Sequence, residues 1–326
     1  MRGQNLREVK IADLHKAKKR LAKYLTPTPL TSSELLNIYL GGKVYLKLEN
    51  LQPACSYKIR GAINKCLSLK EEFGDDVSII TASSGNHGLA CAYASKLLKM
   101  TSKVYVPVST PQIKKDNIRA LGATLVETGE TYDSSFISAC EEAEKSQELN
   151  YVHPVSDVDV VAAQGTIGLE ILEQLEDAEQ VIIPLGGGGL SSGIAFAIKN
   201  LKPDVNIISV MPEGSDVYVK SREAGKLVTI ENPHSIADAV VRRCGEEYLF
   251  PYIEKYVDEI RTVSEESMKK AIKTAAVYGK VVLEAAGAMP LAAILEDKEL
   301  LDKKTVLICS GGNIDESLFT ECINTF

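Results

Sequence analysis

Short apolar runs rich in β-branched residues alternate with longer stretches in which apolar residues recur every three or four positions. The short runs predict buried strands and the longer stretches predict amphipathic helices. The predicted strands are Val77–Thr81, Val104–Val108, Thr124–Thr128, Val181–Leu185, Asn206–Val210 and Thr305–Cys309. The predicted helices are Leu89–Leu98, Gln112–Leu121, Ser134–Lys145, Gly168–Leu175, Leu190–Leu201, Glu266–Val277 and Ala286–Leu295. Continuous apolar strands separated by such helices predict an α/β fold with mostly parallel sheets covered on both faces.

The alternation falls into two β/α clusters, residues 71–152 and 153–326, and the first seventy residues can join either cluster on pattern alone. In open α/β sheets, ligands bind beyond the carboxyl ends of the strands. The loops that follow the predicted strands are therefore the expected sites of function.

Composition and charge exclude several classes of protein. The 326 residues are 45% hydrophobic and 25% charged, which is typical of a soluble globular chain. The formal net charge of −7 provides no basic surface for nucleic acid. There is no apolar run long enough for a membrane span or a signal peptide. We expect a cytoplasmic protein with no nucleic-acid or membrane partner.

The cysteines and histidines show no metal-binding pattern. The seven cysteines include no CxxC pair, which favours free thiols in a reducing compartment. None of the four histidines lies four residues from another, so a zinc hydrolase has no ligand set here. We expect no metal site.

Four consecutive glycines lie between a predicted strand and a predicted helix. They are Gly186, Gly187, Gly188 and Gly189. Without Cβ atoms, their N–H groups can converge on an anion at the positive end of the helix, and a phosphate is the expected guest. A flexible turn is the alternative. The spacing fits neither a P-loop, because Ile194-Ala195 replaces Lys-Ser/Thr, nor the Gly-x-Gly-x-x-Gly motif of dinucleotide binding.

Two further loops follow apolar strands. Ser83-Ser84-Gly85-Asn86-His87-Gly88 opens a helix with hydroxyl, amide and N–H groups that suit a carboxylate, although His87 alone can equally be a core or capping histidine. Ser310-Gly311-Gly312-Asn313 adds a hydroxyl, and alone it is read as a turn. Lys58, between Tyr57 and Ile59, offers an amine for Schiff-base chemistry, and alone it is read as a surface lysine. Together these groups match an aldehyde cofactor with a phosphate and a pyridine nitrogen.

These motifs and their order resemble the fold-type II pyridoxal-phosphate enzymes, which have the tryptophan synthase β-like fold, and within them the threonine/serine ammonia-lyase and serine racemase family. The segments that carry the resemblance are Leu25–Leu30, Leu46–Asn50, Ser56–Ala62, Ser83–Gly88, Gln164–Thr166, Gly186–Gly189, Pro212–Gly214 and Ser310–Asn313. The resemblance implies two open, twisted, mostly parallel sheets. It assigns residues 1–70 with 153–326 to a large cofactor-binding domain and residues 71–152 to a small domain that carries the substrate loop. It also implies a homodimer.

The resemblance implies pyridoxal 5'-phosphate as the cofactor and gives several residues a role. Lys58 is implied to form a Schiff base with the cofactor and to remove the substrate α-proton. Gly186–Gly189 are implied to hold the phosphate, Asn86 to donate to the cofactor 3'-oxygen, and Ser310 to meet the pyridine nitrogen. A neutral hydroxyl at that nitrogen favours elimination over transamination.

The implied reaction is the deaminating dehydration of L-threonine or L-serine, a small-molecule substrate, to 2-oxobutanoate or pyruvate and ammonia. Ser83, Ser84 and His87 are implied to bind the substrate carboxylate. Ser84 keeps an alternative open, because hydroxyl and amine groups on opposite faces of the cofactor, Ser84 and Lys58, would allow racemisation of serine or another amino acid. An enzyme with both activities is included in this alternative.

The sequence departs from the family pattern at several positions. Tyr57 replaces the usual phenylalanine, and His153–Asp157 replaces a more acidic and aromatic segment near the substrate. Met211 stands where metal-activated relatives carry a glutamate ligand, so we expect no metal activation. The preferred substrate among serine, threonine and 3-hydroxyaspartate therefore stays open. A β-replacement enzyme of the cysteine-synthase kind fits the loops less well, and a non-catalytic binding protein would not need Lys58.

Overall fold

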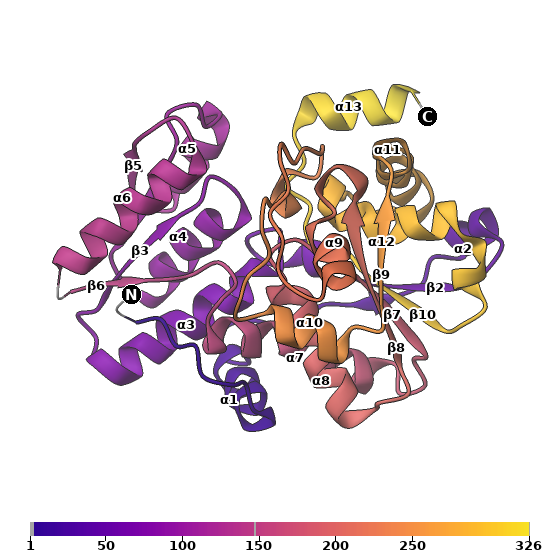
Figure 1. The fold of residues 1–326 in the computed structure, drawn as a ribbon, viewed down its shortest axis with the longest axis horizontal. Coiled ribbons are helices and arrows are strands. Elements are labelled where there is room, and N and C mark those ends of the chain that lie inside the picture. The colour runs from indigo at the N-terminus through magenta and orange to yellow at the C-terminus, as the bar shows by residue number, and fades with distance from the viewer. Residues whose placement is uncertain (1–2, 147, 326) are drawn as a thin grey trace. The chain divides into compact units, whose positions relative to one another are not determined.

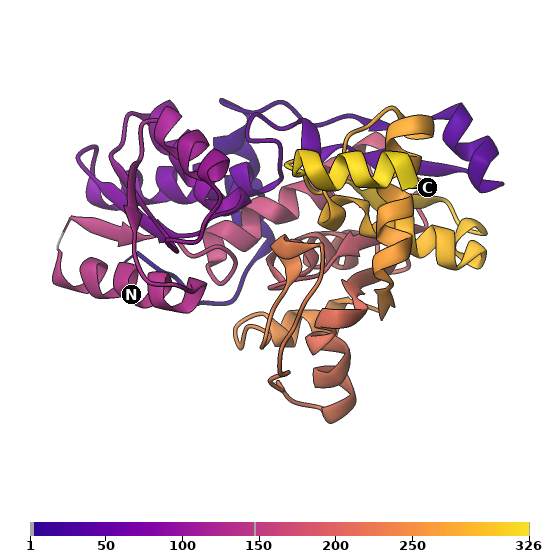
Figure 2. The same ribbon diagram turned by 90° about the horizontal axis from the view of Figure 1, so that it is seen from above.

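The computed structural model describes residues 3–146 and 148–325. Its backbone contacts divide the chain into two compact units, each of which is built from two separate stretches of sequence. Unit 1 comprises Met1–Leu25 and Tyr57–Gln164, and unit 2 comprises Thr26–Ser56 and Gly165–Phe326. Figures 1 and 2 show the order of the elements along the chain. Each unit has its own sheet, as the sequence pattern predicts.

Unit 1 is built on a parallel sheet of four strands in the order β5-β4-β3-β6. The strands are β3 (Ser78–Ala82), β4 (Ser102–Val106), β5 (Thr124–Glu127) and β6 (Leu149–Tyr151). The helices are α1 (Ile11–Leu21), α3 (Lys58–Phe73), α4 (Asn86–Leu98), α5 (Gln112–Ala120) and α6 (Tyr132–Lys145). Helix α7 (Val158–Gln174) begins in unit 1 and continues into unit 2.

Both faces of the unit 1 sheet are covered because successive strand residues point to opposite sides. Ile80, Ala82 and Tyr105 pack on one face with the apolar residues of α6. Val104 and Val106 pack on the other face with α4 and α5. The carboxyl end of β3, which leads into the Ser83–Gly88 loop, is thus fixed by a buried strand between two helical layers.

Unit 2 is built on a sheet of six strands in the order β1-β2-β10-β7-β8-β9, in which only β1 is antiparallel to its neighbour. The strands are β1 (Leu30–Thr31), β2 (Val44–Lys47), β7 (Gln180–Pro184), β8 (Asn206–Pro212), β9 (Glu259–Val263) and β10 (Thr305–Ile308). The α-helices are α2 (Glu34–Leu40), α8 (Gly189–Leu201), α9 (Val217–Ala224), α10 (Phe250–Tyr256), α11 (Glu265–Thr274), α12 (Ala285–Glu296) and α13 (Glu316–Thr325). Short 3-10 turns lie at Glu49–Leu51, Glu213–Ser215, Asp238–Val240 and Lys298–Leu301, and a π-helical turn lies at Ala275–Gly279.

The connections of unit 2 place helices on both faces of its sheet. The β7-α8-β8 connection runs in one direction along the sheet, and the return from β9 through α12 to β10 runs in the other. Because such crossovers are right-handed, α8 and α12 lie on opposite faces. Ile182, Ile208 and Leu307 pack with the alanine-rich α12. The C-terminal helix α13 lies against α11 (Figure 1).

The division by contacts differs from the boundaries expected from the sequence. Residues 1–25, 57–70 and 153–164 group with the four-stranded sheet, although the sequence placed them with 153–326 in the larger part. The reason is that α3 packs against α4, and α1 packs against α3. The assignment of a cofactor-binding role and a substrate-loop role to the two parts stays a prediction.

Candidate functional site

The glycine loop of unit 2 joins β7 to α8, and all four of its glycines are buried. Gly188 is the N-cap of α8 and has a φ of 94°, a left-handed conformation that favours glycine. A Cβ at Gly186 would lie 2.7 Å from the Cα of Val240, and a Cβ at Gly188 would lie 2.9 Å from the Tyr218 hydroxyl. Glycine is therefore required for both the backbone conformation and the close packing of this loop.

The backbone N–H groups at the start of α8 are available to a ligand. The N–H of Ser192 donates to the Gly188 carbonyl over 2.8 Å. Within residues 3–146 and 148–325, the N–H groups of Gly187–Ser191 donate to no acceptor. The Ser192 hydroxyl is also buried and has no partner in the same part of the chain. Donors without acceptors at a helix N-terminus fit a phosphate, so the loop can hold the phosphate of pyridoxal 5'-phosphate.

The side chain of Tyr218 in α9 forms hydrogen bonds that hold the glycine loop. Its hydroxyl donates to the carbonyl of Gly187 over 3.2 Å and accepts the N–H of Glu246 over 3.0 Å. Burial raises the pKa of Tyr218, so the hydroxyl stays protonated and keeps its donor role. The sequence analysis missed this residue because it lies some thirty positions away and in another element.

Ser310 follows β10 and is buried. The next residue, Gly311, forms a β-bridge with Ser56, and the N–H of Gly312 donates to the Cys55 carbonyl over 2.9 Å. The hydroxyls of Ser310 and Ser56 have no hydrogen-bond partner in the part of the chain that the structure describes, and that of Ser56 is fully buried. Two unpaired hydroxyls on adjacent segments fit a polar ring atom of the cofactor, as the sequence predicts for Ser310.

In unit 1, Lys58 is the first residue of α3 and is partly buried. Its Nζ donates to the carbonyl of Pro154 over 2.9 Å and lies 5.2 Å from the centre of the Tyr57 ring. The amine is thus directed at the segment between β6 and α7. The sequence analysis did not identify Pro154, because a backbone carbonyl leaves no signature in the residue type.

The Ser83–Gly88 loop of unit 1 leads from β3 into α4. A Cβ at Gly88 would lie 2.1 Å from the Ser83 carbonyl oxygen, so the observed conformation of the loop requires glycine at this position. The Ser83 hydroxyl accepts the N–H of Gly85 over 3.2 Å. The Ser84 hydroxyl is half-buried and has no hydrogen-bond partner among the described residues. It is therefore available to a substrate.

His87 and Asn86 occupy the first turn of α4. The imidazole of His87 is buried, with its Nε2 3.0 Å from the Val152 carbonyl and 3.6 Å from the Sγ of Cys91. Burial raises the pKa of the Cys91 thiol. These contacts fit the alternative reading of His87 as a core or capping histidine, and its contribution to carboxylate binding stays a prediction. Asn86 is placed at the helix start, where the sequence expected it.

The predicted residues are thus distributed over both units. Unit 1 carries the amine and the carboxylate loop, and unit 2 carries the phosphate loop and the ring hydroxyl. In the described ranges 3–146 and 148–325, no three His, Cys, Asp or Glu side chains are grouped so that they could hold a metal ion. No helix in those ranges is long and apolar enough to cross a membrane.

Comparisons with known proteins agree with this chemistry. The model of the family described as "Pyridoxal-phosphate dependent enzyme" matches residues 21–311. The L-threonine ammonia-lyase of Thermotoga maritima is 37% identical over 97% of this chain and 78% of its own length. The serine racemase of Dictyostelium discoideum is 36% identical over 97% of this chain and 98% of its own. The solved structure of maize serine racemase matches with a TM-score of 0.89 and 31% identity, over 96% of this chain and 96% of that one.

Proposed function

Because this chain belongs to the family of pyridoxal-phosphate dependent enzymes, we propose that it is a lyase that converts L-threonine or L-serine, by dehydration followed by hydrolysis, to ammonia and a 2-oxo acid. Its cofactor is pyridoxal 5'-phosphate, and the products are 2-oxobutanoate or pyruvate. Relatives named threonine ammonia-lyase, at 37% and 39% identity, support this activity. The structural observation that carries the proposal concerns Ser310, a buried residue whose hydroxyl has no hydrogen-bond partner in the described chain.

When bound, the cofactor supplies an electron sink for the charge that develops at the substrate α-carbon. The residues of unit 2 bind and orient it. The N–H groups of Gly186–Gly189 and the Ser192 hydroxyl would hold its phosphate. Ser310 would donate a hydrogen bond to the ring nitrogen without giving up its proton, so that nitrogen would stay uncharged, which would favour elimination of the substrate β-hydroxyl over transamination.

The residues of unit 1 act on the substrate. Lys58 would hold the cofactor aldehyde through Nζ, and the same amine would act as the base that takes the substrate α-proton. In the structure, the Pro154 carbonyl accepts a hydrogen bond from Nζ, an interaction that suits the ammonium form after it has taken the proton. The Ser83–Gly88 loop would bind the substrate carboxylate, and Asn86 would donate a hydrogen bond to the cofactor 3'-oxygen.

A panel of β-hydroxy amino acids tests this proposal. The L- and D-forms of serine, threonine and 3-hydroxyaspartate are incubated with the purified enzyme and cofactor, and ammonia and the 2-oxo acid are measured. We expect equal amounts of ammonia and 2-oxobutanoate or pyruvate from L-threonine or L-serine. The absence of 2-oxo acid from every substrate would contradict the lyase assignment.

The half-buried Ser84 hydroxyl, which lacks a partner among the described residues, favours racemisation as a second candidate function. A proton donor opposite Lys58 would return the proton to the other face of the α-carbon. The named serine racemase relative, with 36% identity, supports this candidate.

We expect Ser84→Ala to lower the formation of D-serine from L-serine by roughly 10²-fold, because it removes the second proton donor. Elimination from L-threonine should change only a few-fold. Chiral chromatography of the remaining amino acid measures the first rate, and 2-oxo acid formation measures the second. Ser83→Ala is the control, since its hydroxyl accepts the Gly85 N–H and should affect both rates together. Equal losses of both rates in Ser84→Ala would remove the racemase role.

We further propose that the enzyme is a homodimer, as its resemblance to the family implies, and that it is cytoplasmic, as its cysteine pattern favours. Leu35 and Ile38 of α2 are exposed by 55% and 69%, and Val282 by 49%. Exposed apolar side chains of this size favour an interface with a second copy.

A further inference from the structure

The N-terminal segment, residues 3–9, which we call the arm, lies before α1 and is bound to the start of α7 within unit 1. The side chain of Gln4 donates to the carbonyl of Ser156 over 2.7 Å. The N–H of Asn5 donates to the carboxylate of Asp157 over 2.9 Å, and the carbonyl of Asn5 accepts the N–H of Val158 over 2.8 Å. Gln4 and Asn5 of the arm thus form hydrogen bonds to three successive residues, 156 to 158.

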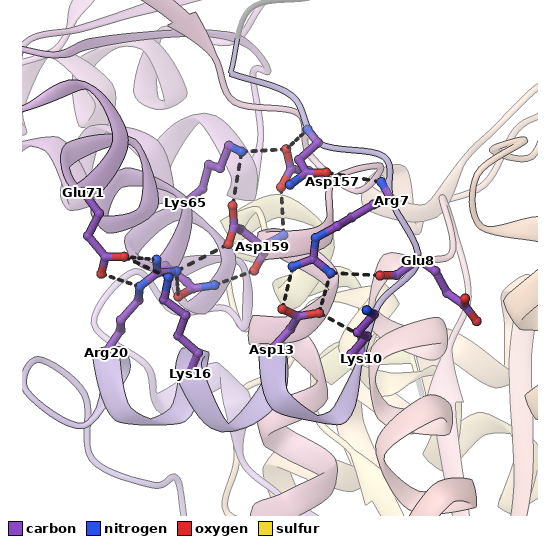
Figure 3. A network of polar contacts seen from close by, with 12 residues as sticks. Arg7, Glu8, Lys10, Asp13, Lys16, Arg20, Lys65, Glu71, Asp157 and Asp159 are labelled. Atoms are coloured by element: carbon purple, nitrogen blue, oxygen red, sulfur yellow. Dashed lines mark hydrogen bonds and ion pairs between the residues drawn. The ribbon is translucent and has the colours of Figure 1, made fainter.

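Asp157 is the centre of this contact. Its side chain is fully buried, and it lies 2.8 Å from Nζ of Lys65, which is only 2% exposed (Figure 3). Its other oxygen accepts the N–H of Asp159 over 2.8 Å. Burial raises the pKa of Asp157, and the charge of Lys65 offsets part of that rise. A buried carboxylate that loses a hydrogen-bond donor is destabilised, because water cannot replace the donor. The N–H of Asn5 therefore helps to hold the Asp157 side chain in its observed position.

The same loop also receives the amine of Lys58. Lys58 and Lys65 are seven positions apart on α3, which is two helical turns and places them on one face. Lys58 bonds to Pro154 over 2.9 Å and Lys65 bonds to Asp157 over 2.8 Å. The loop 154–157 is therefore attached to α3 at both of its ends. The position of this loop therefore sets the position of the Pro154 carbonyl, which accepts the hydrogen bond from Nζ of Lys58.

We propose that the arm is a positioning element for Lys58. By completing the hydrogen bonds of Asp157, it orders the loop 154–157, and the ordered Pro154 carbonyl fixes the direction of the Lys58 amine. Asp157 and Asn5 are positioning residues, because they act on the amine through the Pro154 carbonyl. This inference rests on the proposed function, in which Lys58 binds the cofactor.

A matched pair of variants at Asn5 tests the proposal. Asn5→Pro removes the N–H that Asp157 accepts and keeps the carbonyl that Val158 needs. Asn5→Ala keeps both main-chain groups and removes the side-chain amide, whose oxygen accepts the N–H of Arg7 over 3.2 Å. We expect Asn5→Pro, and not Asn5→Ala, to speed hydrogen exchange at the amides of residues 155–158 in the holoenzyme by roughly tenfold.

Two kinetic measurements separate positioning from a structural role. After removal and return of the cofactor, Asn5→Pro should form the covalent lysine–cofactor bond more slowly, as followed by its absorbance. It should also lower kcat by roughly tenfold with little change in KM, because a small misplacement of a reacting group costs rate more than binding. Deletion of residues 2–8 should give the same pattern, and thermal unfolding confirms that each variant is folded.

The outcomes are distinct. If the wild-type enzyme forms the covalent bond and Asn5→Pro matches Asn5→Ala in exchange and in kcat, the positioning role is overturned and the proposed function stands. Faster exchange with unchanged bond formation and kcat also overturns it. If the wild-type chain forms no covalent bond with the cofactor, the proposed function fails and this inference fails with it.

Discussion

Replacement of Lys58 with alanine is expected to lower kcat for 2-oxo acid formation by roughly 10³- to 10⁴-fold, because in the proposed function one amine both binds the cofactor and moves the α-proton. The Nζ of Lys58 is directed at the Pro154 carbonyl in the structure, and alanine removes this amine. Steady-state kinetics with L-serine and L-threonine at saturating cofactor give kcat directly. The absorbance of the covalent adduct should disappear in the same variant.

Lys70→Ala is the matched control for this prediction. Lys70 also lies on α3 and also donates to a backbone carbonyl, that of Leu98 over 3.1 Å. Loss of this lysine should leave kcat within a few-fold of the wild-type value. If Lys58→Ala keeps more than about a tenth of wild-type kcat, which is far above what loss of a general base leaves, Lys58 does not have the proposed role.

The second large effect is expected at Gly88. A methyl group at this position would meet the Ser83 carbonyl oxygen at 2.1 Å, and a backbone atom cannot move away without displacing the loop. We expect Gly88→Ala to lower kcat/KM by roughly 10²-fold or more, since it shifts the loop that we propose binds the substrate carboxylate. The free energy of unfolding should fall by about 1–3 kcal/mol. Steady-state kinetics and denaturant unfolding measure the two effects.

Gly85→Ala provides the comparison within the same loop. A Cβ at Gly85 meets no heavy atom within 4 Å, and its φ of −114° is accessible to alanine. This variant should retain kcat/KM and stability close to the wild-type values. If Gly88→Ala keeps wild-type kcat/KM while its stability falls, the Ser83–Gly88 loop does not bind the substrate.

The predicted strands are all present in the structure, because buried parallel strands are continuous apolar runs that are easy to recognise. The run Val181–Leu185 corresponds to β7, Gln180–Pro184, with every residue buried. The edge strand β9, Glu259–Val263, was missed because four of its five residues are only partly buried and its sequence includes charges. The antiparallel β1 has two residues, too few for any periodicity.

Helix α3 was also missed, although it carries Lys58. All residues from Ile59 to Cys66 are buried, including the polar Arg60, Asn64 and Lys65, so no apolar stripe stands out from a polar face. The boundaries between the two units depend on the same helix, since its packing against α4 assigns residues 57–70 to unit 1. Sequence pattern alone cannot show which neighbour such a helix selects.

The site loops were predictable because glycines and hydroxyl residues directly follow apolar strands in the sequence. The residues that hold these loops in place could not be predicted. The Gly187 carbonyl accepts a hydrogen bond from Tyr218, and Asp157 forms an ion pair with Lys65, in both cases between residues far apart in the sequence. These partners are brought together only by the tertiary fold, and one of the contacts to Lys58 is a backbone carbonyl.

Reductive trapping tests the central claim most directly. Borohydride reduction of the holoenzyme converts a lysine–cofactor double bond into a stable secondary amine, and peptide mass mapping locates the modified residue. We predict that the cofactor mass is found on the peptide that contains Lys58. A stable label on a different lysine, or no label on a chain reconstituted with the cofactor, would contradict the account.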